Sequence, residues 1–556
     1  MKKIQLKNIR SLLDTGPVCL SPITLLLGEN SSGKSTFLRT FPLIRQSISK
    51  RTDGPLLWAG DVDDYVDFGS FAETVTNGGA KEMTFSFSFQ SQVFDDNELL
   101  MVGIPHNPFE LQCKQPDEIT YTMTVAQHEG HEYVAKLRID LNQTSFTFLL
   151  QPGSEQGEVL VNETLVVSAT EKLPMIFSAQ IKENREFVFN DFFPMSARSI
   201  FGFDLPSIVE LFFELHGHFV SVYRQRQKKA TRKPDYFTQH SLTMATLLFR
   251  NIGMLLNKGI PWENIEPVLT SQIRENVTQD KSAIPNQHLQ IMRKIHILNP
   301  AEREHVLTIC RLIGLYAGFR TLEDYLNGYF RQVHYIAPVR ATAERYYRLR
   351  NLAIDEVDAQ GKNLPMFLNS LSSSRMRAFQ QWTQDSFGFQ VMVERNAGHL
   401  SIKVARQTDR GMNLSDTGFG YSQILPIITQ LWDLSTSPEH QQHQQHQQTP
   451  LVIAIEQPEL HLHPALQAKL AQAFAASIQL AKEHHYELQL LLETHSETIV
   501  NYFGRAIARG DFRREDISIV LFDKNVQTND TAVRTTAYDQ DGFLMDWPIG
   551  FFAPER

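Results

Sequence analysis

The strongest chemical signal in the sequence is a glycine-rich segment near the amino terminus. Gly28-Glu-Asn-Ser-Ser-Gly-Lys-Ser35 follows the apolar run Pro22–Leu27 and precedes a segment, Thr36–Ser49, with helical periodicity. Glycines let such a loop wrap a phosphate with its backbone N–H groups, and the following helix adds a positive dipole end. The pattern GxxxxGK[ST] therefore predicts a phosphate-binding loop (the P-loop), in which Lys34 contacts the β- and γ-phosphates of ATP and Ser35 binds Mg²⁺. Further ATP contacts are expected from Asn30, Ser31, Ser32, Gly33 and Thr36.

A second segment predicts the metal side of the same site. The apolar run Leu451–Ile455 ends in Glu456, as in a buried parallel strand with an acid at its carboxyl edge. A carboxylate in that position can bind Mg²⁺, directly or through water. Because Glu456 and the P-loop lie near opposite ends of the chain, the two halves of the site must flank a large insertion.

The elements that would position these residues fall into two kinds. Residues 2–10 and Met83–Gln90 alternate as strands do, whereas the sequence from about Leu205 to Phe330 has helical periodicity. Strand character returns at His334–Ala337. We expect an N-terminal head segment, a β-rich part, a helical insertion and a C-terminal head segment, at 1–90, 91–204, 205–330 and 331–556.

Composition excludes several classes of protein. The chain has 556 residues and a formal net charge of −9, so its bulk charge does not indicate a nucleic-acid binder. Its three cysteines have no metal-type spacing and are too few for a disulfide framework, which suits a reducing cytosol. The sequence shows neither a secretion signal nor a run apolar enough to span a membrane. We therefore expect a cytoplasmic protein.

Taken together, these motifs resemble the ABC-type heads of the SMC, Rad50, RecF and OLD ATPases. Asn8-Ile-Arg-Ser11 resembles their opening strand, and Glu456-Gln-Pro-Glu-Leu-His-Leu-His-Pro464 resembles their Mg²⁺ motif and the loop after it. Leu490-Leu-Leu-Glu-Thr-His-Ser496 resembles the strand that ends in their switch histidine, so His495 is expected to contact the γ-phosphate. The resemblance implies an α/β fold, an ABC-type ATPase head with a mixed P-loop sheet and helices, split by a large β-then-helical insertion.

One departure from that class concerns the base of hydrolysis. The class usually carries a second carboxylate directly after the Mg²⁺ acid, but this sequence has Gln457 there. A glutamine can orient a water molecule and cannot accept its proton. Either Glu459 acts as the base instead, or hydrolysis is slow and ATP serves mainly to hold a dimer and time its opening.

A glycine-rich turn before the Mg²⁺ strand resembles the signature motif of ABC-type enzymes. The segment Gly418–Gln423 (the signature turn) precedes a helix expected to begin near Ile424. The resemblance implies that the turn contacts ATP bound by the opposite protomer, so a head-to-head dimer is expected. The residues expected to make that contact are Gly418, Gly420, Ser422 and Gln423.

Several motifs together resemble a narrower group, the PtuA-type ATPases of Septu anti-phage defence systems and their retron-associated relatives. They include Val66–Phe71, His334–Ala341 and the tail FLMDWPIGFFAPER, and they cover the head segments only. The resemblance implies that the chain holds and controls an HNH nuclease similar to PtuB. In the retron-linked form, a reverse transcriptase and its RNA–DNA hybrid (msDNA) would be further partners. No nuclease motif is found in the chain itself.

A basic run in the middle of the chain leaves a second function open. It is a candidate contact for nucleic acid or an acidic partner, although a solvated helix end explains it equally well. The alternative function is a DNA-repair or structural-maintenance ATPase of RecF or Rad50 type that clamps DNA directly. The absence of sustained heptads in 91–330 and the net charge of −9 argue for the regulator. The basic residues of the run are Arg224, Arg226, Lys228, Lys229, Arg232 and Lys233.

Overall fold

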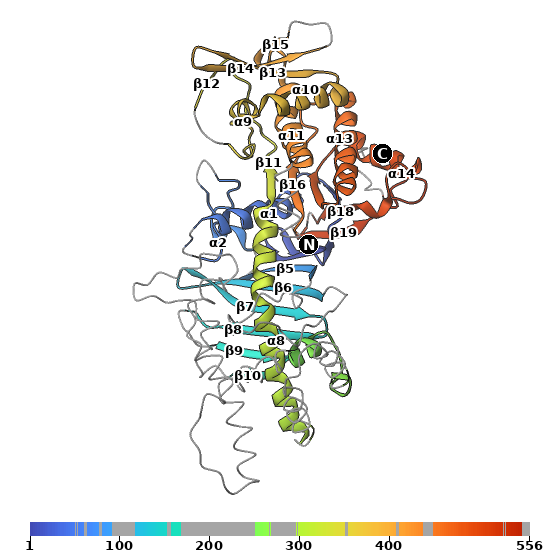
Figure 1. Cartoon of the computed structure of the whole chain (residues 1–556). Helices are drawn as coiled ribbons and strands as arrows, with labels where there is room; N and C mark the ends of the chain where they lie inside the picture. Colours follow the sequence, from blue (N-terminus) through green and yellow to red (C-terminus); the bar gives the residue numbers. More distant parts are fainter. Residues whose placement is uncertain are drawn as a thin grey trace, which may run out of the picture. The chain divides into compact units, whose positions relative to one another are not determined.

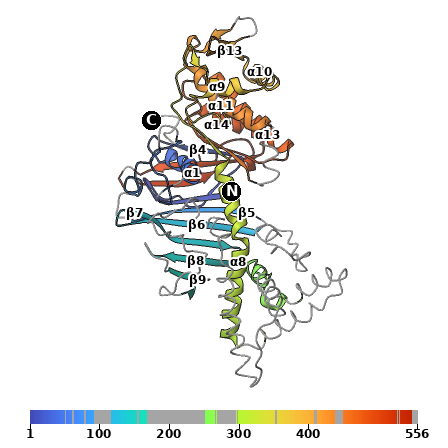
Figure 2. The same ribbon diagram turned by 60° about the vertical axis from the view of Figure 1, so that its left-hand side comes forward.

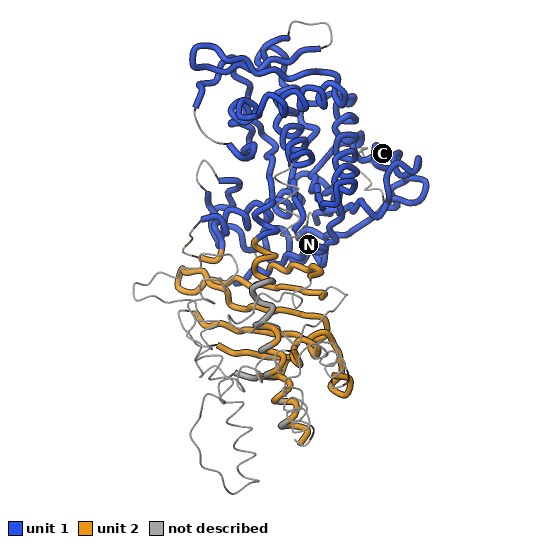
Figure 3. Tube along the Cα trace, viewed as in Figure 1, with its two compact units in different colours: residues 1–50, 56–84, 328–556 blue, residues 51–55, 85–327 orange. Residues whose placement is uncertain are grey.

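The chain divides into two compact units, and the N- and C-terminal segments come together in one of them. Unit 1 holds residues 1–50, 56–84 and 328–556, and unit 2 holds 51–55 and 85–327 (Figure 3). The expected head segments, 1–90 and 331–556, fall almost entirely in unit 1. The computed structural model describes residues 1–50, 52, 54–60, 64–76, 81–91, 117–152, 157–167, 251–265, 267, 296, 299–350, 354–406, 411–437, 449–525, 527–528 and 530–546.

The centre of unit 1 is a mostly parallel sheet built from both ends of the chain. Its strand order is β11-β16-β17-β4-β18-β19, and only β18 and β19 pair antiparallel. Four neighbouring strands, β11, β16, β17 and β4, are buried along their whole length, which explains their mostly apolar sequences. The strands are β11 (Val333–Ile336), β16 (Leu451–Glu456), β17 (Leu488–Glu493), β4 (Ile23–Gly28), β18 (Ile517–Lys524) and β19 (Thr531–Thr536).

Helices pack on the two faces of this sheet (Figures 1 and 2). Successive residues of a strand point to opposite faces. Ile23, Leu25 and Leu27 of β4 belong to one apolar core with residues of α11, α13 and α14. Helix α1 packs against β16, β11 and β17, but its buried side chains are not part of that core, so it covers the other face. The helices are α1 (Lys34–Ser49), α11 (Phe419–Thr436), α13 (Pro464–Glu483) and α14 (Glu497–Ala508).

The rest of unit 1 surrounds the central sheet. A small antiparallel sheet has the order β12-β14-β13, with β15 paired to β14, and it packs against α9 and α10. Near the N-terminus, β1 pairs antiparallel with β2 and β3. The elements are β1 (Lys3–Ile9), β2 (Leu12–Asp14), β3 (Val18–Cys19), α2 (Phe71–Thr74), β12 (Tyr347–Arg348), α9 (Leu364–Ser370), α10 (Ser373–Phe387), β13 (Gln390–Asn396), β14 (His399–Ala405) and β15 (Met412–Asn413).

Unit 2 begins with antiparallel strands and ends in helix. Strands β6 to β10 pair in chain order, and β5 (Glu82–Ser91) precedes them. Residues 251–257 are helical, and α8 (Pro300–Arg331) leads back to unit 1. The described elements thus follow the expected order of strands and then helices. The strands are β6 (Asp117–His128), β7 (His131–Leu141), β8 (Thr144–Leu150), β9 (Gly157–Val161) and β10 (Thr164–Val167).

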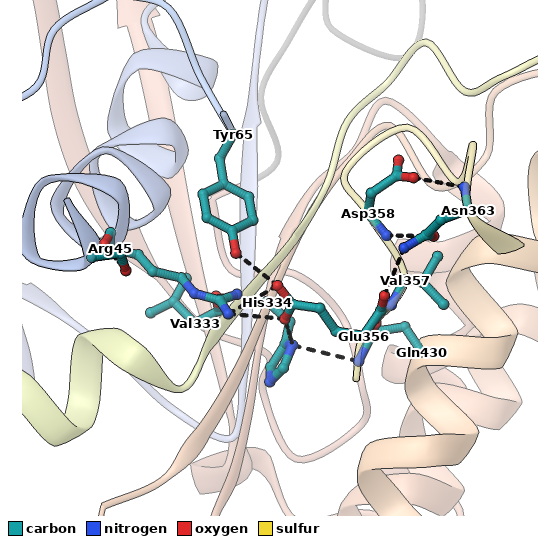
Figure 4. Close-up of polar contacts among 10 residues, drawn as sticks. Arg45, Tyr65, Val333, His334, Glu356, Val357, Asp358, Asn363 and Gln430 are labelled. Atoms are coloured by element: carbon teal, nitrogen blue, oxygen red, sulfur yellow. Dashed lines mark hydrogen bonds and ion pairs between the residues drawn. The ribbon is translucent and has the colours of Figure 1, made fainter. Parts of the chain in front are cut away.

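A polar cluster around Glu356 (the Glu356 cluster) fastens α1 to the C-terminal segment (Figure 4). The Glu356 carboxylate accepts hydrogen bonds from Arg45 on α1, at 2.9 Å, and from the Tyr65 hydroxyl, at 2.7 Å. It also lies 2.8 Å from Nδ1 of His334 on β11. Burial would raise the pKa of Glu356, but His334 and Arg45 hold it well below its usual range. The cluster therefore fixes the helix that follows the P-loop against strand β11.

The expected fold class is confirmed. The chain has an α/β fold in which a mixed P-loop sheet with helices is assembled from two distant segments, with a region of strands and then helix between them. The expected strands at 2–10 and 22–27 correspond to β1 and β4, and the helix after the P-loop corresponds to α1. In the part of the chain that is described, no helix is long and apolar enough to cross a bilayer.

Candidate nucleotide-binding site

The P-loop joins β4 to α1, and its geometry requires glycine at both ends. A Cβ atom on Gly28 would overlap the Phe522 carbonyl oxygen. Gly33 has a φ of +91°, and a Cβ there would lie 2.8 Å from Ser11 Oγ. Both contacts are shorter than real Cβ atoms allow, so any larger residue would displace the loop. The two glycines thus let the chain turn tightly between the strand and the helix N-terminus.

Lys34 lies at the start of α1 with its ammonium group folded over the loop. Its Nζ donates hydrogen bonds to the carbonyl oxygens of Gly28, at 2.8 Å, and Glu29, at 2.6 Å. Burial lowers the pKa of Lys34, and the nearby carboxylates of Glu493, Glu29 and Glu459 oppose that shift. A buried ammonium group held by loop carbonyls can exchange them for phosphate oxygens, as the P-loop pattern predicts.

A cavity of about 510 Å³ lies beside the P-loop. Every residue from Asn30 to Thr36 lines it, so the structure brings together the whole predicted set of P-loop contacts. Ser32 Oγ, which is buried, has no hydrogen-bond partner among the described residues, as expected of a group that awaits a ligand. The other lining residues are Arg10, Ser11, Gln457 and Glu493.

Glu456 lies at the end of β16, as predicted, but its carboxylate is fully engaged by protein. Arg39 on α1 donates to both oxygens, from Nε at 2.6 Å and from Nη2 at 2.8 Å. The Tyr335 hydroxyl donates to Oε1 at 2.7 Å. Burial opposes the charge on Arg39, yet the Glu456 carboxylate raises the pKa of Arg39 above its ordinary value. Direct binding of Mg²⁺ by Glu456 therefore stays a prediction, and it would require Arg39 to move.

Glu493, at the end of β17, is the carboxylate that reaches the cavity. Its Oε1 accepts a hydrogen bond from Ser35 Oγ at 2.9 Å. Burial and the neighbouring Glu456 raise the pKa of Glu493 to about 7. Glu493 was not predicted as a site residue, although Leu488–Glu493 repeats the pattern of Leu451–Glu456: an apolar strand that ends in an acid.

Gln457 lines the cavity directly after Glu456. Its backbone N–H donates to the Glu493 carbonyl oxygen at 2.8 Å, and its φ is +44°, which is uncommon outside glycine. The Arg340 guanidinium, which is buried, donates to the carbonyl oxygens of Glu456, at 2.8 Å, and Gln457, at 3.3 Å. The structure thus gives Arg340 a structural role, in which it fixes the turn that carries Gln457.

Glu459 links the loop after β16 to the loop after β17. Its carboxylate accepts hydrogen bonds from Thr494 Oγ1, at 2.8 Å, and from the His495 backbone N–H, at 2.7 Å. Burial raises the pKa of Glu459, although these hydrogen bonds oppose the shift. Since both oxygens have partners and the residue does not line the cavity, its suggested role as a base stays a prediction.

His495 follows β17 at the predicted place. Burial, together with the charge of Lys34, lowers the pKa of His495 to about 4. The imidazole is therefore neutral at pH 7 and can donate one hydrogen bond and accept another. A neutral donor beside the P-loop lysine suits the predicted contact with the γ-phosphate, which stays a prediction.

The signature turn differs from the expectation in one respect. Helix α11 begins at Phe419, not near Ile424, so Ser422 and Gln423 are helical and buried. The Ser422 hydroxyl donates to the Phe419 carbonyl oxygen at 2.8 Å. The physical reason is that only Gly418, with a φ of +78°, needs a non-helical conformation. Gly418 and Phe419 are exposed at the helix N-terminus, and the predicted contact with a second protomer stays a prediction.

Comparison with known proteins agrees with a nucleotide site. A family model described as "AAA ATPase domain" matches residues 342–500, which include the signature turn, Glu456 and His495. A comparison with curated proteins finds no match. The match and the P-loop geometry together support an ATPase.

Solved structures of SMC heads resemble the chain only weakly. The head of Pyrococcus furiosus Smc, bound to the C-terminal domain of ScpA, has 11% identity, 96% coverage of each chain and a TM-score of 0.31. The Pyrococcus yayanosii head, with a coiled coil and joint, has 11% identity, 97% coverage of each chain and a TM-score of 0.32. The Thermotoga maritima head has 9% identity and a TM-score of 0.30, and the match covers 96% of this chain and 97% of that one. Because these TM-scores are low, the assignment of the fold rests on the strand order and the P-loop.

The basic run at Arg224–Lys233 lies outside the described residues. Its predicted contact with nucleic acid or an acidic partner therefore stays a prediction.

Proposed function

We propose that this chain binds Mg²⁺ and ATP at the P-loop cavity and hydrolyses ATP slowly. The observation that carries the proposal is the cavity itself, in which the P-loop, the buried Lys34 ammonium and the Ser35–Glu493 pair converge. Backbone N–H groups of the loop bind the phosphates, and Lys34 neutralises part of their charge. Ser35 lies on the metal side of the cavity, near the acids that end β16 and β17. Mg²⁺, when bound with ATP, polarises the phosphoryl group for attack by water.

Slow hydrolysis follows from Gln457. The attacking water must lose a proton, and the residue next to Glu456 in this cavity is an amide, which can orient water without accepting that proton. Glu459, the nearest alternative acid on this loop, has both oxygens engaged by Thr494 and His495. The ATP-bound state is therefore long-lived, which suits a protein that uses ATP to hold a conformation or an assembly.

At a finer level, we propose that the chain is a regulatory scaffold of a bacterial anti-phage defence system. The support is the resemblance to PtuA-type ATPases in the head segments, which unit 1 brings together. In this proposal a cytoplasmic head-to-head dimer holds an HNH nuclease similar to PtuB and keeps it inactive until infection. A retron reverse transcriptase and its msDNA would bind the same scaffold in systems that contain them.

Co-expression with an HNH nuclease similar to PtuB tests this finer proposal. We expect the nuclease to co-purify with the wild-type chain, and we expect Lys34→Ala to change the DNA cleavage that the complex performs. A nuclease that fails to co-purify with the wild-type chain would contradict the proposal and leave the ATPase assignment standing.

The basic run at Arg224–Lys233 is the one observation that favours direct DNA clamping. Phosphate contacts by these residues would make DNA affinity fall steeply with salt. Replacing the six basic residues with glutamine should then abolish DNA binding in a salt titration. DNA binding that is tight, ATP-dependent and independent of any partner would favour the clamp over the regulator.

A further inference from the structure

Two glutamates occupy equivalent positions at the edge of the central sheet. Glu456 ends β16, Glu493 ends the neighbouring β17, and the two residues are register partners. Both are almost completely buried, with 1% and 3% of their surfaces exposed. A pair of carboxylates so close together repel each other unless cations compensate their charge. The hydrogen-bond partners of each carboxylate therefore indicate which one is already neutralised by a cation of the protein and which one can bind a further cation.

Glu456 already has its cation. The Arg39 guanidinium binds both carboxylate oxygens side-on, and Tyr335 adds a third hydrogen bond. Two parallel, charge-assisted bonds of this kind are among the strongest polar contacts in proteins. A metal ion at Glu456 would have to displace Arg39 and leave a partly buried guanidinium group without its partner, which is costly.

Among the described residues, no ammonium or guanidinium group is shown hydrogen-bonded to the Glu493 carboxylate, although the charges of Lys34 and Arg39 act on it from nearby. Its Oε1 accepts from Ser35, whereas Oε2 is buried and has no hydrogen-bond partner among the described residues. The Lys34 ammonium is directed to the carbonyl oxygens of Gly28 and Glu29. A buried carboxylate oxygen without a partner is destabilising, and a bound cation would relieve that cost.

We propose that Glu493 binds Mg²⁺ together with Ser35 in the ATP-bound protein. Mg²⁺ prefers a small number of protein oxygens together with phosphate oxygens and water, and the Ser35 hydroxyl and the Glu493 carboxylate provide such a pair beside the P-loop. Glu456 then acts as a positioning residue that holds Arg39 and Tyr335 against the edge of the sheet. This inference rests on the proposed ATP-binding function.

Nucleotide affinity measured with and without Mg²⁺ tests the assignment. The full chain is titrated with a fluorescent ATP analogue, first in excess Mg²⁺ and then in EDTA, and the ratio of the two affinities is the gain due to the metal. Loss even of residues that only support a metal ligand costs about 10- to 100-fold in metal affinity, so Glu493→Gln should reduce the gain by at least about tenfold. Its affinity in EDTA should stay close to that of the wild type.

Two variants serve as comparisons. Glu497→Gln changes an exposed acid four residues further along the chain and should leave both affinities unchanged. Glu456→Gln keeps an acceptor for Tyr335 and should keep most of the gain. If that variant fails to fold, the double variant Arg39→Met with Glu456→Gln removes the guanidinium group together with its partner.

The outcomes separate this inference from the function on which it rests. If Glu493→Gln kept the full gain in nucleotide affinity due to Mg²⁺, the metal assignment would be overturned. The proposal that the chain binds ATP would not be affected. Absence of nucleotide binding by the wild-type chain in either buffer would instead overturn the proposed function. Binding of Mn²⁺ in place of Mg²⁺, followed by electron paramagnetic resonance with ATP present, gives an independent readout. Its spectrum should change in Glu493→Gln and not in Glu497→Gln.

Discussion

At the residue scale, the site depends on a few side chains whose partners decide their chemistry. Glu456 and Glu493 are both glutamates and are register partners in neighbouring strands. The first is neutralised by Arg39, whereas the second contacts Ser35. Gln457 is adjacent to both and lines the cavity. The sequence could predict Glu456 and Gln457, because they follow an obvious apolar strand. It could not show that Arg39 would reach Glu456, because that contact joins residues far apart in the chain.

A prediction at this scale concerns Gln457. Replacing it with glutamate places a carboxylate where water can approach the P-loop, and a positioned general base contributes about 10²- to 10⁴-fold to a rate. Wild-type turnover should lie below about 1 s⁻¹, at the slow end for enzymes, and Gln457→Glu should increase it by at least about tenfold. Steady-state phosphate release measures both rates, with Gln472→Glu, at an exposed position of α13, as the matched substitution outside the cavity.

A variant of Glu459 separates two mechanisms of hydrolysis, one with Glu459 as the base and one in which water is only positioned. Glu459→Gln should stop residual turnover if Glu459 acts as the base, whereas loss of positioning alone should only weaken it. Fast wild-type turnover that neither change affects would show that this loop has been assigned the wrong role.

At the element scale, the fold places the ends of β16, β17 and β4 beside the N-terminus of α1. Strand β17 lies between the other two, so Glu493 is nearer in sheet order to the P-loop strand than Glu456 is. Apolar periodicity predicted each of these strands, but strand order depends on tertiary packing, and this is why Glu493 was missed. The start of α11 was predicted too late for a local reason. Two glycines suggested a loop, yet only Gly418 has a positive φ.

The Glu356 cluster gives a prediction about how α1 is held. Glu356→Gln removes the charge that Arg45, Tyr65 and His334 share, and hydrogen bonds to charged groups contribute about 1.5–3 kcal/mol each. The variant should lose roughly that much free energy of unfolding in denaturant titration. Glu394→Gln, at an exposed ion pair with Lys403, should change it by less than about 0.5 kcal/mol.

The stabilisation that the Glu356 cluster gives to the folded protein depends on pH, and the pKa of Glu356 fixes the direction of that dependence. Because the pKa of Glu356 is lower in the folded protein than its ordinary value, its contribution is complete above that ordinary value, about 4.3. The contribution is lost as the pH falls below it. The stability difference between wild type and Glu356→Gln should therefore shrink between about pH 5 and pH 3. A difference that grows on acidification would contradict the assignment.

At the scale of the whole molecule, ATP is expected to join two copies of unit 1. The exposed helix start at Gly418 and Phe419 is the candidate contact with the second copy, and 64% of the Phe419 surface is exposed. Sedimentation velocity should show a larger species with ATP than without it, and Phe419→Asp should prevent the increase. A strictly monomeric chain with ATP at micromolar concentration would contradict the expected dimer.

ATP binding by the P-loop cavity through Lys34 can be measured directly by equilibrium titration. Isothermal titration of the purified chain with ATP and Mg²⁺ should show saturable binding. Lys34→Ala should show no binding up to about 1 mM ATP, while circular dichroism shows that the variant is folded. Lys362→Ala, which removes an exposed lysine of the same unit, should bind as the wild type does. Unchanged ATP affinity in a folded Lys34→Ala variant would contradict the account.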